Sequence, residues 1–298
     1  MAVTMESIKI LRDRTSAGLA DCKKALVESN GDIESAVDWL RKKGLASVAK
    51  KAGRTAAEGV VCVVSSSERS SVVELNSETD FVARNDKFQA LAKSIAGVAC
   101  RCGLDVDAIM NEKMDSGMSV SDELSSVAAI MGENMKLRRV AHLNADNCVV
   151  STYVHNKLSD DCGTIGVLVA VRGGDNESAL AFGRKVAMHI AASSPVALNR
   201  EGVSEDLLAR EREIAKEKQR ALGKGEDMMN KIAEGAVKKF YKENVLLEQQ
   251  YVLDTSKSVA QAAEEGGFTI VDYVRYQLGE GIEKAHVDFA AEVQAQLQ

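Results

Sequence analysis

The residues with the clearest capacity for a functional role are 79–85, which read TDFVARN and follow a β-rich run at 71–76. Phe81 lies in this segment between an acid, Asp80, and a base, Arg84. A bulky ring at such a place can push into a partner protein. The pattern therefore indicates insertion into a partner.

Phe81 has a second interpretation, because it lies on a connection between a strand and a helix. The strand stops at a polar cluster, and Asp86 is the expected N-cap of the next helix. The apolar residues of that helix recur at helical spacing: Phe88, Leu91, Ala92, Ile95 and Ala99. Phe81 is thus either an exposed wedge or a staple that folds back under the first turn of the helix.

Enzyme motifs do not occur in the sequence. There is no HExxH, GxSxG or dinucleotide-binding fingerprint, and residues 221–225 (ALGKG) lack both the upstream strand and the Ser/Thr of a phosphate-binding loop. His189 lies in a nearly all-apolar run and is expected to be a core histidine satisfied by backbone groups. We predict no catalytic residue, no cofactor and no enzyme activity.

The cysteines form no CxxC pair, and the four histidines are scattered. We interpret the cysteines as small buried residues with free thiols, and we expect no metal site. They are Cys22, Cys62, Cys100, Cys102, Cys148 and Cys162.

The TDFVARN segment resembles a signature of the bacterial elongation factor Ts family, and the resemblance continues in order along nearly all 298 residues. It implies an N-terminal domain like the ubiquitin-associated (UBA) domain. The other matching segments are 14–26 (RTSAGLADCKKAL), 31–44 (GDIESAVDWLRKKG), 131–139 (MGENMKLRR), 165–169 (IGVLV), 187–193 (AMHIAAS) and 279–284 (GEGIEK).

The resemblance implies a guanine-nucleotide exchange factor for the GTPase elongation factor Tu. By that resemblance Asp80 and Phe81, completed by Thr79 and Val82, would enter the GTPase near its Mg²⁺ site and promote GDP release. The implied partner-binding residues are Lys23, Met131, Gly132, His155, Val252 and Leu253.

Three of these partner-binding residues, Met131, Gly132 and His155, would frame a pocket for a partner helix. Residues 251–254 read YVLD where the family usually has FVME, so the chain departs from the family pattern at the implied contact of Val252 and Leu253. The alternative function is a non-catalytic adaptor that only tethers partners through its UBA-like module and a helical hairpin, although an adaptor needs no wedge.

The apolar spacing predicts an α+β fold with several parts. Three short helices fill residues 1–44, with Asp32 as an N-cap and Gly44 just past the last helix, and a linker follows at 45–58. We expect a UBA-like domain with its linker at 1–54 and a projecting antiparallel helical hairpin at 204–243.

Two β-hairpin and helix units form the expected core. The first subdomain spans 55–143, with strands at 60–65 and 71–76 and a mostly helical stretch at 120–142. The second spans 144–203 and 244–298, with strands at 148–154, 164–171 and 269–278 and helices at 176–193 and from 282.

Charge and hydropathy limit the possible partners. The net charge of −6 argues against general nucleic-acid binding. Six cations and no acid occur between Arg41 and Arg54, which indicates either a docking surface for an acidic partner or a solvated helix end. The sequence has no signal-peptide core and no membrane span, so we expect a cytoplasmic protein. The protein acts either as one copy or as a homodimer that gives a 2:2 complex.

Overall fold

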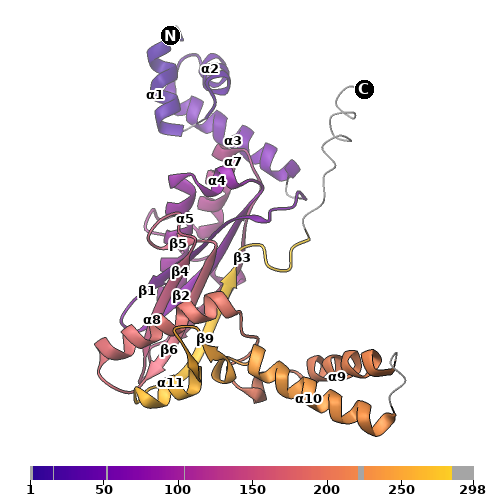
Figure 1. Ribbon diagram of the computed structural model, residues 1–298. Helices are drawn as coiled ribbons and strands as arrows, with labels where there is room; N and C mark the ends of the chain where they lie inside the picture. Colours follow the sequence, from indigo (N-terminus) through magenta and orange to yellow (C-terminus); the bar gives the residue numbers. More distant parts are fainter. Residues whose placement is uncertain (1–2, 16, 52, 104, 221–224, 284–298) are drawn as a thin grey trace.

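The computed structural model describes residues 3–15, 17–51, 53–103, 105–220 and 225–283, without the side chains of 45–50. The fold is α+β, as expected. N-terminal helices lie at one end, two sheets occupy the middle, and a helical hairpin projects from the other end (Figure 1). The helix expected from Ile282 falls mostly outside the described residues.

The N-terminal module consists of α1 (Met5–Thr15), α2 (Leu19–Glu28) and α3 (Ile33–Lys51). Asp32 caps α3 as expected, because its carboxylate accepts a hydrogen bond from the Ser35 amide at 2.8 Å. The expected helix end at Gly44 and linker from residue 45 are wrong, since α3 continues to Lys51. A Cβ at Gly44 would lie 2.5 Å from the Cβ of Ala129, so this glycine permits close helix packing and does not end the helix.

The first sheet has the strand order β3-β2-β1-β5, and helix α5 (Asp86–Cys102) packs against it. Its strands are β1 (Glu58–Ser65), β2 (Arg69–Ser77), β3 (Met135–Asn144) and β5 (Cys162–Gly163). Three further helices complete this part: α4 (Asp80–Ala83), α6 (Val106–Ile109) and α7 (Val120–Met131).

The prediction that 120–142 is mostly helical is wrong in its second half. Helix α7 ends at Gly132, which has a φ of +71° that favours glycine, and its amide bonds to the Ala128 carbonyl. The chain then enters β3, which pairs along β2. The matching segment 131–139 is therefore a helix end followed by a strand.

The second sheet has the order β4-β6-β9 and carries α8 (Asn176–Ser193). Its strands are β4 (Val149–His155), β6 (Ile165–Arg172) and β9 (Thr269–Gln277), which confirms the expected hairpin and late strand. An apolar cluster that includes Val61, Val72 and Leu168 joins the two sheets. The remaining elements are η1 (Arg200–Gly202), η2 (Leu246–Glu248), β7 (Gln250–Tyr251), β8 (Asp254–Ser258) and α11 (Val259–Glu265).

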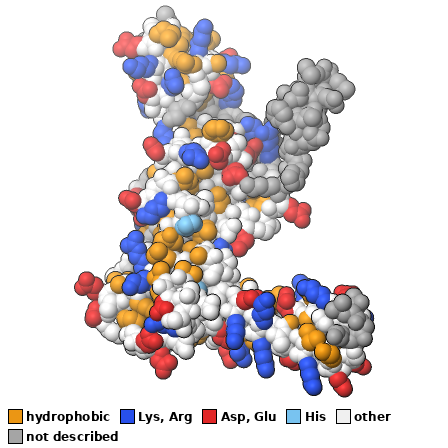
Figure 2. Space-filling model, viewed as in Figure 1, with side chains coloured by type: hydrophobic (Ala, Val, Ile, Leu, Met, Phe, Trp, Pro, Cys, Tyr) orange, Lys and Arg blue, Asp and Glu red, His pale blue; other side chains and the backbone are white. Residues whose placement is uncertain are grey.

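The projecting hairpin consists of α9 (Glu205–Arg220) and α10 (Glu226–Asn244), which pack together as predicted. Arg212 pairs with Glu205 on its own helix and with Glu234 on the other. Hydrophobic side chains remain visible on the outer part of the hairpin, flanked by charges (Figure 2). The Gly223–Lys224 part of the connection lies outside the described residues.

Two cysteines differ from the expectation of free thiols. Cys62 on β1 and Cys162 on β5 are directly opposite each other and form a disulfide. The sequence could not show this pairing, because 100 positions separate the two residues and only the sheet brings them together. The free cysteines are Cys22, Cys100, Cys102 and Cys148.

Candidate functional site

Phe81 lies on the short helix α4 and is 81% exposed. The next two residues, Val82 and Ala83, are buried and belong to the core of the first subdomain. Because those small side chains turn inward, the Phe81 ring points to solvent. The interpretation of Phe81 as a staple beneath α5 is therefore wrong, and the ring is available for contact with another molecule.

The segment 78–83, which we call the wedge turn, is held from a distant part of the chain. The Thr79 amide donates to Glu133 Oε2 at 3.0 Å, and the Thr79 hydroxyl donates to Glu133 Oε1 at 2.7 Å. The Ser77 hydroxyl donates to the Thr79 carbonyl at 2.9 Å. Thr79 is the N-cap of α4 but makes no side-chain capping bond, because its hydroxyl is used for Glu133.

A second contact runs in the opposite direction between the same two segments. Glu78 accepts a hydrogen bond from the Asn134 amide at 2.6 Å and pairs with Arg54 at 3.2 Å. The Asn134 side chain in turn donates to the Arg54 carbonyl at 2.9 Å. The segment at Glu78–Thr79 and the segment at Glu133–Asn134 thus each supply one carboxylate to the other, and these bonds fix both segments in place. The arrangement holds the backbone beneath Phe81 in one position.

The charges beside Phe81 lie in solvent. Asp80 and Arg84 form an ion pair at 3.6 Å, and both side chains are more than half exposed. The residue that caps α5 is Asn85 and not Asp86, because the Asn85 side chain accepts from the Lys87 amide at 2.9 Å. Phe81 is therefore exposed and is flanked in sequence by a carboxylate and a guanidinium. Each of these two charges can give up its present partner for one on another molecule at little cost.

The structure divides the residues expected to frame one pocket. Met131 and Gly132 line a cavity of about 530 Å³ between α7 and the N-terminal module, and Lys51 donates to the Gly132 carbonyl at 2.5 Å. His155 does not line this cavity. It is exposed at the end of β4, where its Nδ1 lies 3.1 Å from the Tyr153 hydroxyl. Lys23 is exposed on α2 and also lies outside the cavity lining.

Val252 and Leu253 form the connection between β7 and β8, and each is 50% exposed. We call these two residues the β7–β8 tip. The Val252 amide donates to Nδ1 of the buried His189 at 3.2 Å. His189 Nε2 lies 2.9 Å from Gln249 Oε1, so the ring carries its proton on Nε2 and is satisfied at both nitrogens.

His189 is a core histidine, as predicted, with a side chain as one of its two partners. Burial is the main cause that lowers its pKa below the ordinary value, and the hydrogen bond to Gln249 opposes this only partly. The ring is therefore neutral near pH 7. It connects α8 to the β7–β8 tip.

Within the described ranges, no group of three or more His, Cys, Asp or Glu is placed to bind a metal ion. No helix in that part of the chain is long and apolar enough to cross a membrane.

Comparison with known proteins places these observations in a family. The family model for elongation factor TS matches residues 78–280, from the wedge turn to the end of the second subdomain. The chain belongs to the elongation factor Ts family. It is 48% identical to elongation factor Ts of Gluconobacter oxydans over 294 residues, which cover 98% of this chain and 97% of that protein. It is 49% identical to the Brucella anthropi protein over 302 residues, covering 99% of each.

Membership of the elongation factor Ts family identifies the chain as a translation elongation factor. Sequence reasoning selected the exposed part of the candidate site, Phe81 and the β7–β8 tip. It missed the carboxylates that hold the wedge turn, Glu133 and Glu78, although Glu133 lies within a segment that carries the resemblance and Glu78 directly precedes another. The available signal was two polar runs, ETD at 78–80 and GEN at 132–134. No local rule pairs segments that lie more than fifty residues apart.

Proposed function

We propose that the protein is a guanine-nucleotide exchange factor for elongation factor Tu. The observation that supports this most directly is the exposed ring of Phe81 on a turn fixed from both sides. An 81% exposed phenylalanine contributes little to its own core, so its place on a rigid turn is best explained by a partner that receives it. The proposal implies a cytoplasmic location, where translation occurs.

An exchange factor works by differential affinity. It must bind the nucleotide-free GTPase more tightly than the GDP-bound form, because only such a difference shifts the equilibrium towards release. GDP is held by a phosphate-binding loop and a Mg²⁺ ion, so displacing the elements that order these groups weakens GDP binding. In this proposal Phe81 separates side chains of the GTPase near the Mg²⁺ site, and Asp80, Thr79 and Val82 complete the inserted segment.

The other expected contacts lie at separate places on the molecule. The cavity lined by Met131 and Gly132 would receive a helix of the GTPase, with exposed His155 as a separate contact, and Lys23 of the N-terminal module would bind another part. The β7–β8 tip would bind another part. Several weak contacts of this kind provide affinity for the complex, and that binding energy drives insertion of the wedge.

The test is release of labelled GDP from purified elongation factor Tu, with and without this chain. We expect acceleration at micromolar concentrations that saturates as the complex forms. Binding without any acceleration would reject exchange activity and favour the adaptor alternative. Absence of both binding and acceleration would reject the partner itself.

A further inference from the structure

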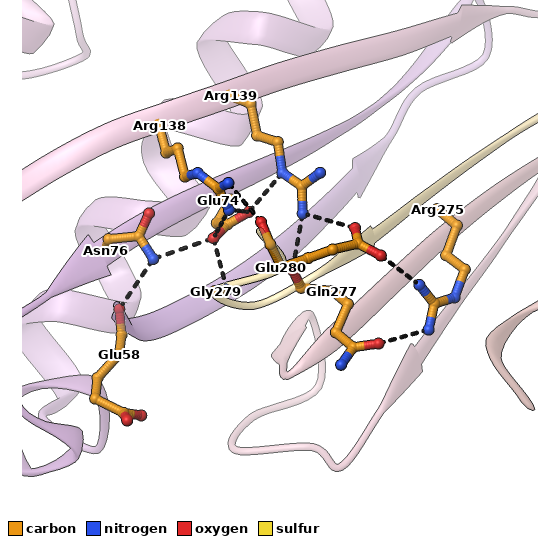
Figure 3. A network of polar contacts seen from close by, with 9 residues as sticks. All are labelled: Glu58, Glu74, Asn76, Arg138, Arg139, Arg275, Gln277, Gly279 and Glu280. Atoms are coloured by element: carbon orange, nitrogen blue, oxygen red, sulfur yellow. Dashed lines mark hydrogen bonds and ion pairs between the residues drawn. The ribbon is translucent and has the colours of Figure 1, made fainter. Parts of the chain in front are cut away.

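A buried carboxylate lies on the strand that leads into the wedge turn. Glu74 is on β2, four residues before Glu78, and its side chain is fully buried. Its two oxygens accept hydrogen bonds from β2, from β3 and from the turn after β9 (Figure 3). The donors are Asn76 Nδ2 at 3.1 Å, Arg138 Nη1 at 3.0 and 3.2 Å, Arg139 Nε at 2.5 Å and the Gly279 amide at 2.9 Å.

The two arginines continue from Glu74 to the C-terminal segment. Arg138 donates to the Glu280 carbonyl at 2.5 Å. Arg139 donates to the Gln277 carbonyl at 2.8 Å, and its guanidinium also packs over the Tyr276 ring at 4.1 Å. Both arginines belong to β3 of the first sheet, whereas residues 276–280 belong to or follow β9 of the second sheet.

The turn that receives these bonds has no space for a side chain at one position. Gly279 has a φ of +70°, and a Cβ there would lie 2.7 Å from the Ala57 carbonyl oxygen. The turn is therefore in close contact with the backbone just before β1. In this close arrangement its amide donates to the Glu74 carboxylate.

Glu74 remains ionised despite its burial. Burial alone would raise its pKa, but the hydrogen bonds from Gly279, Arg139, Arg138 and Asn76 together outweigh that effect and lower the pKa below the ordinary value. A buried ion pair of this kind adds little net stability compared with an apolar replacement, because desolvation offsets the attraction. What it adds is a fixed geometry, because each oxygen accepts only along certain directions.

The Glu74 cluster lies where the two sheets meet, so its fixed geometry bears on how one sheet is oriented relative to the other. The two sheets are also joined by an apolar cluster, whose contacts are not directional, and by the Cys62–Cys162 disulfide and the β1–β5 pairing just before β6. The first sheet carries the wedge turn, and the second subdomain carries the β7–β8 tip. The Glu74 cluster is a set of directed bonds between these two parts.

We infer that Glu74 is a positioning residue for nucleotide exchange, which fixes the wedge turn relative to the second subdomain. This inference rests on the proposed exchange function. If the GTPase is bound through both subdomains, a fixed junction lets binding at the β7–β8 tip drive Phe81 into its target. With a loose junction, each subdomain binds the GTPase independently, and the wedge turn moves back instead of entering its target.

Two variants break the junction from opposite sides. Glu74→Gln keeps the side-chain shape and removes the charge that pairs with both arginines. Gly279→Ala leaves Glu74 intact and displaces the turn. Asp115→Asn is the control, because the exposed carboxylate of Asp115 pairs with Arg101 on α5 inside the first subdomain and lies away from the junction.

The measurement is GDP release from elongation factor Tu over a range of exchange-factor concentrations, together with urea unfolding of each variant. For both junction variants we expect the maximal release rate to fall about tenfold, while the half-saturating concentration changes less than about threefold. Asp115→Asn should match the parent chain in both quantities. Hydrogen exchange at residues 278–281 should be faster in both junction variants than in the control.

The outcomes separate this inference from the proposed function. No acceleration by the parent chain would reject the exchange function, and this inference with it. Acceleration by the parent and an unchanged maximal rate in the folded variants would reject this inference alone. If Glu74→Gln does not fold, Gly279→Ala decides the matter by the same criteria. A higher half-saturating concentration with an unchanged maximal rate would also overturn this inference.

Discussion

Thr79 and Glu133 are joined by two hydrogen bonds, one from the Thr79 amide and one from its hydroxyl, although 54 positions separate them in the sequence. The contact connects the wedge turn to the residue that follows the glycine end of α7. One carboxylate thus fixes both the backbone and the side chain of the residue that begins α4.

Removal of this carboxylate should loosen the wedge turn. Glu133→Ala leaves two partly buried donors of Thr79 without their acceptor, at a cost of about 1–3 kcal/mol in unfolding free energy. We expect acceleration of GDP release to fall about fivefold or more. Glu123→Ala on α7, which removes only an exposed contact with Ser116, is the control for both assays.

One result for Glu133→Ala would contradict the role given to the fixed wedge turn. If the variant accelerated GDP release as well as the parent while Thr79 amide exchange was faster, a fixed wedge turn would not be required for exchange.

Truncation of the wedge should affect function and not stability. Phe81→Ala removes an exposed ring, so we expect a change of about 0.5 kcal/mol or less in unfolding free energy and a loss of about tenfold or more in exchange stimulation. Phe88→Ala is the matched comparison, because Phe88 is fully buried and its truncation should cost about 3–5 kcal/mol. Urea midpoints and GDP release on both variants check the contrast. A large stability loss in Phe81→Ala would show that the ring packs in solution.

The sequence predicted elements whose signals are local. Periodicity was sufficient for α5, α8, β9 and the projecting hairpin, because each shows its own apolar pattern along the chain. It failed at β3, where the left-handed Gly132 ends α7 and an apolar stretch changes from helix to strand. It also failed at Gly44, where the reason for a glycine is the distant Ala129.

The same limit applies to the candidate site. Phe81 is recognisable from its place in a polar connection, whereas Val252 and Leu253 were indicated by the family resemblance alone. The partners that hold them, Glu133 for the wedge turn and His189 for the β7–β8 tip, come from segments more than fifty residues away. Only the fold shows those pairings.

The disulfide predicts a definite thiol count. Protein purified without reductant and then denatured should show four reactive thiols, and six after reduction, because Cys62 and Cys162 are paired. Closure of so long a loop should stabilise the chain by about 2–4 kcal/mol, which a lower denaturant midpoint after reduction would show. Six thiols before reduction would contradict the pairing.

Stability should depend on pH through His189. Its folded pKa is lowered from the ordinary 6.5, so the unfolded chain takes up a proton that the folded chain excludes. Stability is therefore complete above about pH 6.5 and declines as pH falls towards the folded pKa. His142 has a lowered pKa for the same main reason, burial, with Arg69 adding to it, and contributes to the same window.

Denaturant midpoints of the parent and His189→Gln at pH 7.5 and 5.5 test this assignment. The variant should lose less stability between the two pH values than the parent. Equal losses would assign the dependence to His142 and other groups.

The projecting hairpin leaves apolar side chains in solvent, and we propose that they contact another molecule, either a second copy of this chain or the GTPase. Ile214 on α9 and Met228 on α10 are 47% and 49% exposed. A hollow of about 220 Å³ beside Ile214 is also lined by Ile232 and Ala236. An exposed apolar region on a thin hairpin is typical of a contact surface.

Deletion of residues 204–241 with a short Gly/Ser linker tests the hairpin. The deletion should leave the fold intact, because the chain enters and leaves the hairpin side by side, where Ala197 and Val245 form a β-bridge. It also retains Glu243, whose carbonyl accepts a hydrogen bond from Gln249 at 2.8 Å. We expect a change in sedimentation or in affinity for elongation factor Tu, while Phe81 retains at least part of its effect on GDP release.

Ile214→Ser with Met228→Ser tests the apolar surface without removing either helix. If the free parent protein sediments as a larger assembly and the double variant does not, the contact is with a second copy of this chain. Weaker binding to the GTPase with unchanged sedimentation would identify the GTPase. If the deletion matched the parent in sedimentation, affinity and exchange rate, the hairpin would be a tolerated insertion, because an essential contact of that size could not be lost without changing one of the three.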